Sequence, residues 1–122
     1  MKKIIIIISF LVLVSNSFGQ LNDKNYKYCK EILKTENVYL VNSLFIINSE
    51  LNQNQINTLT GLLFEKTSIY KVELNSKHNE ISVFHLSDVT YEDIKLLLEP
   101  MGIEFNFKQT TKLKKSQSEF SE

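Results

Sequence analysis

The order of its apolar segments is the feature of this sequence that most restricts the fold. Between Val38 and Phe107 the apolar residues switch repeatedly between the two-residue period of a strand and the 3.6-residue period of a helix. Polar runs, a proline and a glycine separate the segments, as is typical of turns. The pattern predicts a strand, a helix, two strands, a helix and a strand, over Val38–Ile47, Asn54–Thr67, Ile69–Leu74, Ile81–Leu86, 90–99 and Ile103–Phe107.

This order predicts an α+β fold, a ferredoxin-like βαββαβ sandwich over residues 38–107, with two helices on one face of a four-stranded antiparallel sheet. A short amphipathic helix over Lys24–Glu36, with Asp23 as its N-cap, is expected within the preceding segment 20–37. The last residues are rich in Lys, Ser, Thr and Gln and have little to bury. Residues 108–122 are therefore expected to form a disordered tail.

Residues 1–19 have the parts of a secretory signal peptide. Lys2 and Lys3 precede an apolar run, and Ser17 and Gly19 stand at the two positions that a signal peptidase recognises. We therefore expect cleavage between Gly19 and Gln20 and an exported bacterial protein, periplasmic or secreted. As a helix the apolar run would span about 16 Å, short of the roughly 30 Å hydrocarbon core, so no stable membrane anchor is expected after cleavage.

Charge and composition exclude several classes of function. The 14 basic and 14 acidic side chains balance, which argues against a nucleic-acid partner, because such partners normally need a clustered basic face. The chain has no Arg, the residue best suited to clamp phosphate or carboxylate groups. Its single Cys excludes an internal disulfide and a thiolate-only zinc site. No spacing typical of a nucleophile elbow, phosphate loop or catalytic triad occurs, so we do not expect an enzyme.

Several packing and turn positions follow a recognisable spacing. They include two core leucines in the first sandwich helix, a valine-containing second strand, the third strand, an acidic start of the second helix and a glycine after that helix. The positions are Leu59 with Leu63, Ser68–Asn75, Ile81–Val83, Val89–Ile94 and Met101–Ile103. In this spacing, residues from about 48 to 107 resemble the heavy-metal-associated (HMA) domain of copper chaperones, mercury-binding proteins and metal-pumping ATPases. The resemblance implies the fold more than the chemistry.

The resemblance places the two metal-binding cysteines of that family at Asn52 and Gln55. An amide side chain cannot supply the thiolate that selects Cu(I), Zn or Hg, so the metal-binding loop is degenerate. The sequence thus keeps the spacing of the loop and lacks its ligands.

Four other residues are candidate metal ligands. His78 lies in the loop between two predicted strands, where a histidine is usually solvated. His85 ends a strand and is expected to face solvent or a neighbouring backbone group. Met101 follows a helix end, where methionine usually packs into the core, and Cys29 is expected to be partly buried and inert.

The sequence therefore predicts a small exported, non-enzymatic domain that binds a protein partner and needs no cofactor. Two alternatives stay open. One is a carrier or sensor that holds a transition metal through unorthodox ligands. The other is a secreted sandwich domain, unrelated to metals, that binds a ligand or a protein through its open sheet face. The sequence predicts no particular oligomeric state.

Overall fold

The computed structural model describes residues 18–35 and 37–113. Its elements, in chain order, are β1 (Phe18–Leu21), α2 (Asp23–Thr35), β2 (Leu40–Ile46), α3 (Gln53–Phe64), β3 (Ile69–Leu74), β4 (Glu80–Leu86), α4 (Tyr91–Leu98), the 3₁₀ turn η1 (Glu99–Met101) and β5 (Asn106–Lys112). Within these described residues, three helices and one antiparallel sheet confirm the predicted α+β class, although the sheet has five strands and not four.

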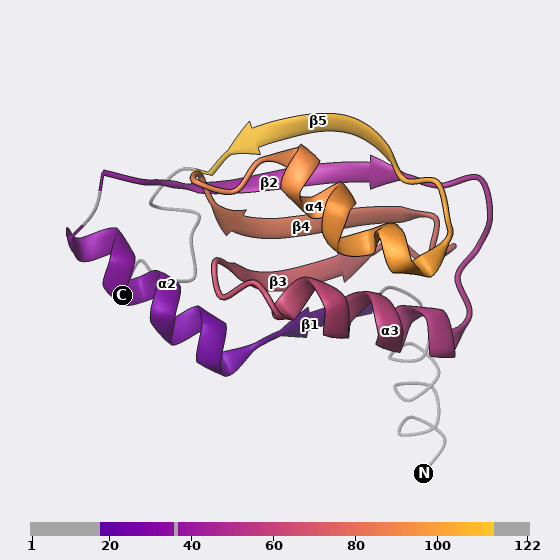
Figure 1. Ribbon diagram of the computed structural model, residues 1–122, viewed down its shortest axis with the longest axis horizontal. Coiled ribbons are helices and arrows are strands. Elements are labelled where there is room, and N and C mark those ends of the chain that lie inside the picture. The colour runs from indigo at the N-terminus through magenta and orange to yellow at the C-terminus, as the bar shows by residue number, and fades with distance from the viewer. Residues whose placement is uncertain (1–17, 36, 114–122) are drawn as a thin grey trace, which may run out of the picture.

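The strands follow one another across the sheet in the order β1-β3-β4-β2-β5. α3 and α4 lie together on one face of the sheet, and α2 lies at one end of it, in contact with β3 (Figure 1). Ile46 at the end of β2 pairs with Glu80 at the start of β4, whereas Leu40 pairs with Leu86 at the opposite end. We call these two ends of the sheet the hairpin end, after the β3–β4 hairpin, and the α2 end.

The main core fills the space between the sheet and the helices α3 and α4. Successive side chains of a strand point to opposite faces, so alternate residues of β2 and β4, among them Phe45, Ile81 and Val83, are fully buried on this side. Leu59 and Leu63 of α3 pack against them. Burying each such side chain stabilises the fold by roughly 1.5–3 kcal/mol.

Each core-facing helix begins with a reciprocal pair of hydrogen bonds, the capping box. At the start of α3 the Asn52 side chain accepts from the N–H of Gln55 at 2.8 Å, and the Gln55 side chain accepts from the N–H of Asn52 at 2.9 Å. Thr90 and Asp93 make the same exchange at α4, where the sequence predicted a helix start. These bonds lower the pKa of Asp93 below its ordinary value. Gly102, with a left-handed φ of 68°, ends η1 as predicted.

The side chain of Asn25 holds α2 against the rest of the protein. Its Nδ2 donates hydrogen bonds to three backbone carbonyls around the α3–β3 turn, those of Phe64 (2.9 Å), Lys66 (3.2 Å) and Ile69 (2.8 Å). Carbonyls at the end of a helix have no partner within the helix, so the amide supplies donors that α3 lacks. The N–H of Asn25 in turn donates to Oδ1 of Asn22 at 2.9 Å. The predicted N-cap of α2, Asp23, is therefore wrong, because Asn22 makes the capping bond.

The last strand lies later in the chain than predicted. β5 extends to Lys112, so the expectation of disorder from residue 108 is wrong for residues 108–112. Most side chains of β5 are exposed, and its backbone pairs with β2 at the edge of the described sheet. β5 forms through backbone pairing with β2 and contains few apolar residues, so the apolar pattern of the sequence does not predict it. The remaining expected tail, 114–122, lies outside the described residues.

A strand that the sequence did not predict forms the other edge of the sheet. β1 pairs with β3, with Gly19 opposite Glu73 and Gln20 opposite Val72. The expected signal-peptide cleavage point thus falls inside β1. Residues 1–17 of the expected signal peptide lie outside the described residues.

Replacing the Asn25 amide tests the attachment of α2. Asn25→Ala leaves the buried carbonyls without their side-chain donor, so we expect a loss of about 1–3 kcal/mol of unfolding free energy in urea titrations. Asn25→Asp replaces the donating amide with a carboxylate that faces the same carbonyl oxygens, so it should lower the unfolding free energy by more. Asn54→Ala, at an exposed position of α3, is the control and should stay within about 0.5 kcal/mol. A loss below about 0.5 kcal/mol for Asn25→Ala would contradict this role.

Candidate functional site

The two positions that correspond to the metal-binding cysteines of the resembled family lie together at the start of α3. Asn52 is the N-cap residue, and Gln55 follows it in the first turn. Their amide groups bond to each other's backbone N–H groups, so both side chains serve the helix start. Neutral amides in these roles offer a soft metal ion no thiolate.

His78 lies beside this loop at the hairpin end of the sheet. It is in the β3–β4 hairpin with a left-handed φ of 56°, its carbonyl accepts from the N–H of Leu51 at 3.1 Å, and its Nδ1 lies 3.3 Å from the Leu51 carbonyl oxygen. Met101 lies in η1, which contacts α3, and its partly buried side chain packs against the main core. Among the described residues, no three His, Cys, Asp or Glu side chains gather where they could hold a metal ion.

Cys29 lies at the α2 end and is more completely buried than expected. Its side chain has no exposed surface, and Sγ lies 3.6 and 3.5 Å from the backbone carbonyl oxygens of Thr67 and Ser68. Burial raises the pKa of this thiol to about 12, and the charge of Asp88 adds a smaller effect. A thiol that stays protonated is neither a metal ligand nor a nucleophile.

His85 is also at the α2 end, and its side chain has the second of its two expected surroundings, a neighbouring backbone group and not solvent. It is 1% exposed, and its Nδ1 donates to the backbone carbonyl of Leu86 at 2.8 Å, so the expected backbone contact is present. A neutral imidazole that donates through Nδ1 accepts through Nε2, so the Ser43 hydroxyl donates to Nε2 at 2.8 Å. Thr110 Oγ1, 3.2 Å from Ser43 Oγ, completes a chain of three side chains across β4, β2 and β5.

The Ser43–His85 contact has the atoms of a nucleophile and its base, but it lies inside the core. Ser43 has no exposed surface, so a substrate has no path to its hydroxyl. Burial lowers the pKa of His85, while the Leu86 carbonyl and the Asp88 charge offset part of that effect. The arrangement keeps the imidazole neutral and joins three strands.

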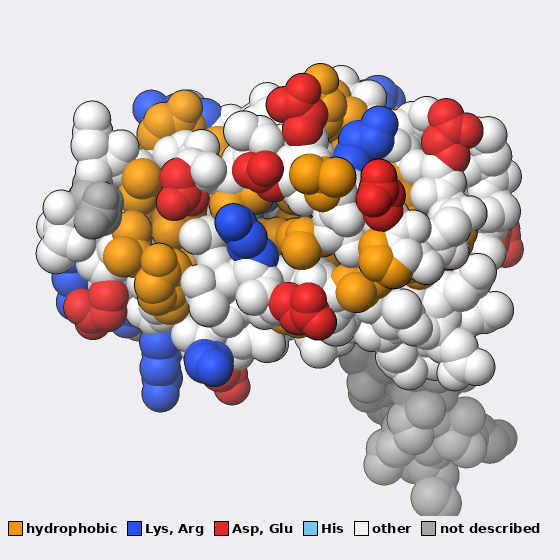
Figure 2. Space-filling view, in the orientation of Figure 1, with side chains coloured by type: hydrophobic (Ala, Val, Ile, Leu, Met, Phe, Trp, Pro, Cys, Tyr) orange, Lys and Arg blue, Asp and Glu red, His pale blue; other side chains and the backbone are white. Residues whose placement is uncertain are grey.

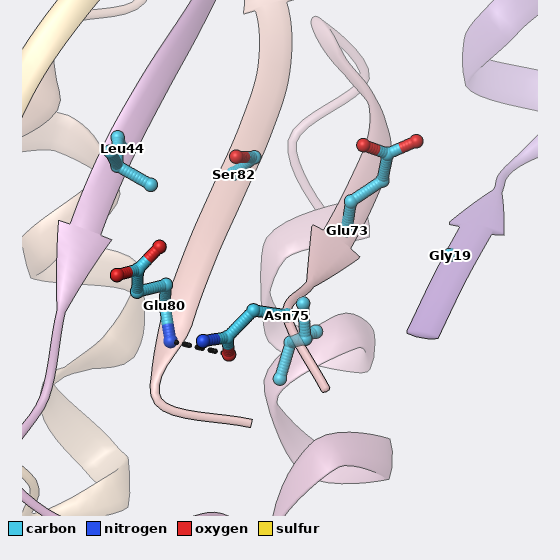
Figure 3. Close-up of a pocket in the computed structure, with 7 residues that line it drawn as sticks. Gly19, Leu44, Glu73, Asn75, Glu80 and Ser82 are labelled. Atoms are coloured by element: carbon cyan, nitrogen blue, oxygen red, sulfur yellow. Dashed lines mark hydrogen bonds between the residues drawn. The ribbon is translucent and has the colours of Figure 1, made fainter. Parts of the chain in front are cut away.

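A hollow of about 370 Å³ lies on the sheet face opposite α3 and α4. One cross-strand row forms most of it, because Leu44 pairs with Ser82, Ser82 with Glu73, and Glu73 with Gly19. The small residues Gly19 and Ser82 leave space between larger neighbours (Figure 3). The hollow is therefore a consequence of side-chain size along one row.

Polar groups border this hollow at the hairpin end. Glu80 contributes its carboxylate, and Asn75 closes the hairpin by accepting at Oδ1 from the N–H of Glu80 at 3.0 Å (Figure 3). Glu73 forms a salt bridge of 3.2 Å with Lys71, and its side chain is 46% exposed. The site thus combines an apolar wall at Leu44 with accessible carboxylates.

The sequence analysis considered residue types that bind metals and did not predict this hollow. The two-residue period of the strands does place Leu44, Ser82 and Glu73 on the face opposite the core, because each alternates with buried neighbours such as Phe45, Val83 and Val72. Only the pairing register places the three in one row.

Comparison of the chain with protein families, with curated proteins and with solved structures finds no match. In the part of the chain that the structure describes, every helix is too short or too polar to cross a membrane. The site is therefore interpreted from its own geometry.

The burial of neutral His85 predicts a dependence of stability on pH. Its folded pKa lies below the unfolded value of about 6.5, so the unfolded chain binds the extra proton. The stabilisation is complete above about pH 6.5 and is lost as the pH falls toward the folded pKa, with a slope of at most about 1.4 kcal/mol per pH unit. Urea titrations between about pH 7 and 5 measure it. His85→Gln should flatten this slope, whereas an equal slope in the variant and the parent protein would contradict the assignment.

Proposed function

We propose that this chain is a small exported, non-enzymatic binding domain that holds a protein partner on the uncovered face of its sheet. The observation that carries the proposal is the hollow along the row of Leu44, Ser82 and Glu73. These three residues follow the expected cleavage point, whereas cleavage would remove Gly19 from the edge of the hollow. α3 and α4 cover the other face, and α2 covers only the α2 end of this one, so the rest of this face is left for a partner (Figure 1). The predicted signal peptide accounts for the export.

We propose further that the fold is ferredoxin-like and related to the HMA domain. Leaving out β1, the strands follow the order β5-β2-β4-β3 with α3 and α4 on one face, and this order supports the split βαβ arrangement. The position of Asn52 and Gln55 at a helix start supports the relation. On this hypothesis the domain lost the two thiolates, and the freed loop positions became a capping box.

The character of the hollow indicates what kind of partner it takes. Leu44 and the half-buried Phe84 and Ile46 offer apolar contact on this face. Glu73 and Glu80 add carboxylates at the side. Such a mixed surface fits a protein segment that brings an apolar side chain together with a lysine or arginine. The basic side chain would compete with Lys71 for Glu73.

Site-specific photo-crosslinking in the source cells tests the binding face. With a crosslinking residue at Gln109, which pairs with Leu44 on the same row, we expect an adduct of one discrete mass. Adding Ser82→Trp fills the hollow and should remove at least about nine-tenths of the adduct, which is the tenfold change that 1.4 kcal/mol produces.

The matched control for this experiment is Thr58→Trp. Thr58 is exposed on α3, so the same bulk added there should leave the adduct intact. Circular dichroism establishes that both variants are folded. An adduct that survives Ser82→Trp, or none in the parent protein, would contradict binding at the hollow.

Restoring the lost ligands tests the relation to the HMA domain separately. The variant Asn52→Cys/Gln55→Cys, with Cys29→Ala, places two sulfurs at the helix start, on residues whose side chains each reach the other's backbone N–H. We expect it to bind one Cu(I) in competition with a strong chelator, because paired thiolates are the ligands that Cu(I) prefers. Asn52→Cys/Asn54→Cys, with Cys29→Ala, has the same thiol count and should lose its copper to the chelator. Equal retention by the two pairs would contradict the proposed alignment.

A further inference from the structure

A second hollow, of about 450 Å³, lies over α4 and the segment that follows η1. Leu96 is the most exposed large apolar side chain of the described residues, at 62%, and Tyr91 is 37% exposed. Ile103, which is half-buried, and Phe105, which is buried, also line this hollow. We call this surface the α4 groove. It exposes apolar area that a partner would cover.

The α4 groove has an acidic rim. Glu92, Glu99 and Glu104 line it, against the single cation of Lys95. None of these carboxylates forms a salt bridge with a lysine in the described part of the chain, where Glu31 and Glu73 do. Figure 2 shows acidic side chains around exposed apolar atoms over α4. A matching surface therefore needs cations and an apolar or aromatic side chain.

The outer side of α2 is such a surface. It has four lysines and only two carboxylates, and most of them are exposed: Lys24, Lys27, Lys30 and Lys34, with Asp23 and Glu31. Tyr28, on the same helix, is 41% exposed. The inner side of α2 is used for attachment through Asn25 and Cys29, so the outer side faces away from the rest of the protein. Lys34 and Glu31 form an exposed salt bridge of 3.7 Å with each other there.

We propose that copies of this chain associate head to tail, with the outer side of α2 from one copy in the α4 groove of the next. The charges are complementary, and Tyr28 supplies an aromatic contact for Leu96. The two surfaces lie on different parts of the molecule, so one copy uses both at once (Figure 1). Such a heterologous contact builds a ring or an open chain. Contacts of α2 with α2, or of groove with groove, bring like charges together.

Analytical ultracentrifugation of the whole protein over a concentration series, up to about 1 mM, tests the association. We expect self-association at about 0.01 M salt and a dissociation constant at least about tenfold weaker near 1 M, where charges are screened within about 3 Å. A protein that stays monomeric at about 1 mM and low salt would overturn the proposal.

Charge reversal identifies the two surfaces. Glu99→Lys/Glu104→Lys makes the groove basic, and Lys27→Glu/Lys34→Glu makes α2 acidic. Each variant alone should be monomeric, because its two surfaces then have the same sign. Mixed together they should associate, because the unchanged α2 of the first variant fits the unchanged groove of the second. The control Glu50→Lys/Glu65→Lys has the same change of net charge as the groove variant, at other exposed positions, and should associate like the parent protein. Failure of the mixture to associate, or loss of association in the control, would overturn the assignment.

Discussion

The contact between one buried amide and three backbone carbonyls determines how the two parts of this protein fit together. Asn25 is 2% exposed, and its donors meet the carbonyls around the turn from α3 to β3. Removing the amide would take a donor from each of these carbonyls, which is most costly at the buried Ile69 carbonyl, whereas the Lys66 carbonyl also accepts from the N–H of Ile69. Satisfying them fixes α2 at one end of the sheet. Cys29, one turn later, packs against the same turn and completes a small second core with Leu40 and Leu86.

The placement of α2 leaves the sheet with two unlike faces. α3 and α4 lie over one face and enclose the main core, whereas α2 reaches only one end of the opposite face (Figure 1). The face opposite α3 and α4 therefore keeps half-buried side chains and a hollow where Gly19 and Ser82 are small. The positions of the three helices thus account both for the main core on one face of the sheet and for the hollow on the other, where we propose that a partner binds.

The residues that looked chemically reactive serve the fold. Asn52 and Gln55 cap a helix, and Cys29 and His85 are buried with their polar atoms bonded to backbone or hydroxyl groups. In each case desolvation favours the neutral form of the group, or the polar atoms are already used in hydrogen bonds. Cys and His often bind metals or react with substrates, but a buried Cys or His whose polar atoms already contact groups of the fold cannot reach a metal ion or a substrate.

The sequence by itself determined the α+β class, β3 over Ile69–Leu74, the start of α4 at Thr90 and the turn at Gly102, because these depend on local periodicity, capping and backbone freedom. It did not reveal β1 or the extent of β5, because edge strands exist through pairing with distant backbone and need few apolar residues. The burial of His85 and the row formed by Leu44, Ser82 and Glu73 were decided only by the tertiary structure. Register and layer packing set which side chains meet, and both depend on contacts between residues far apart in the chain.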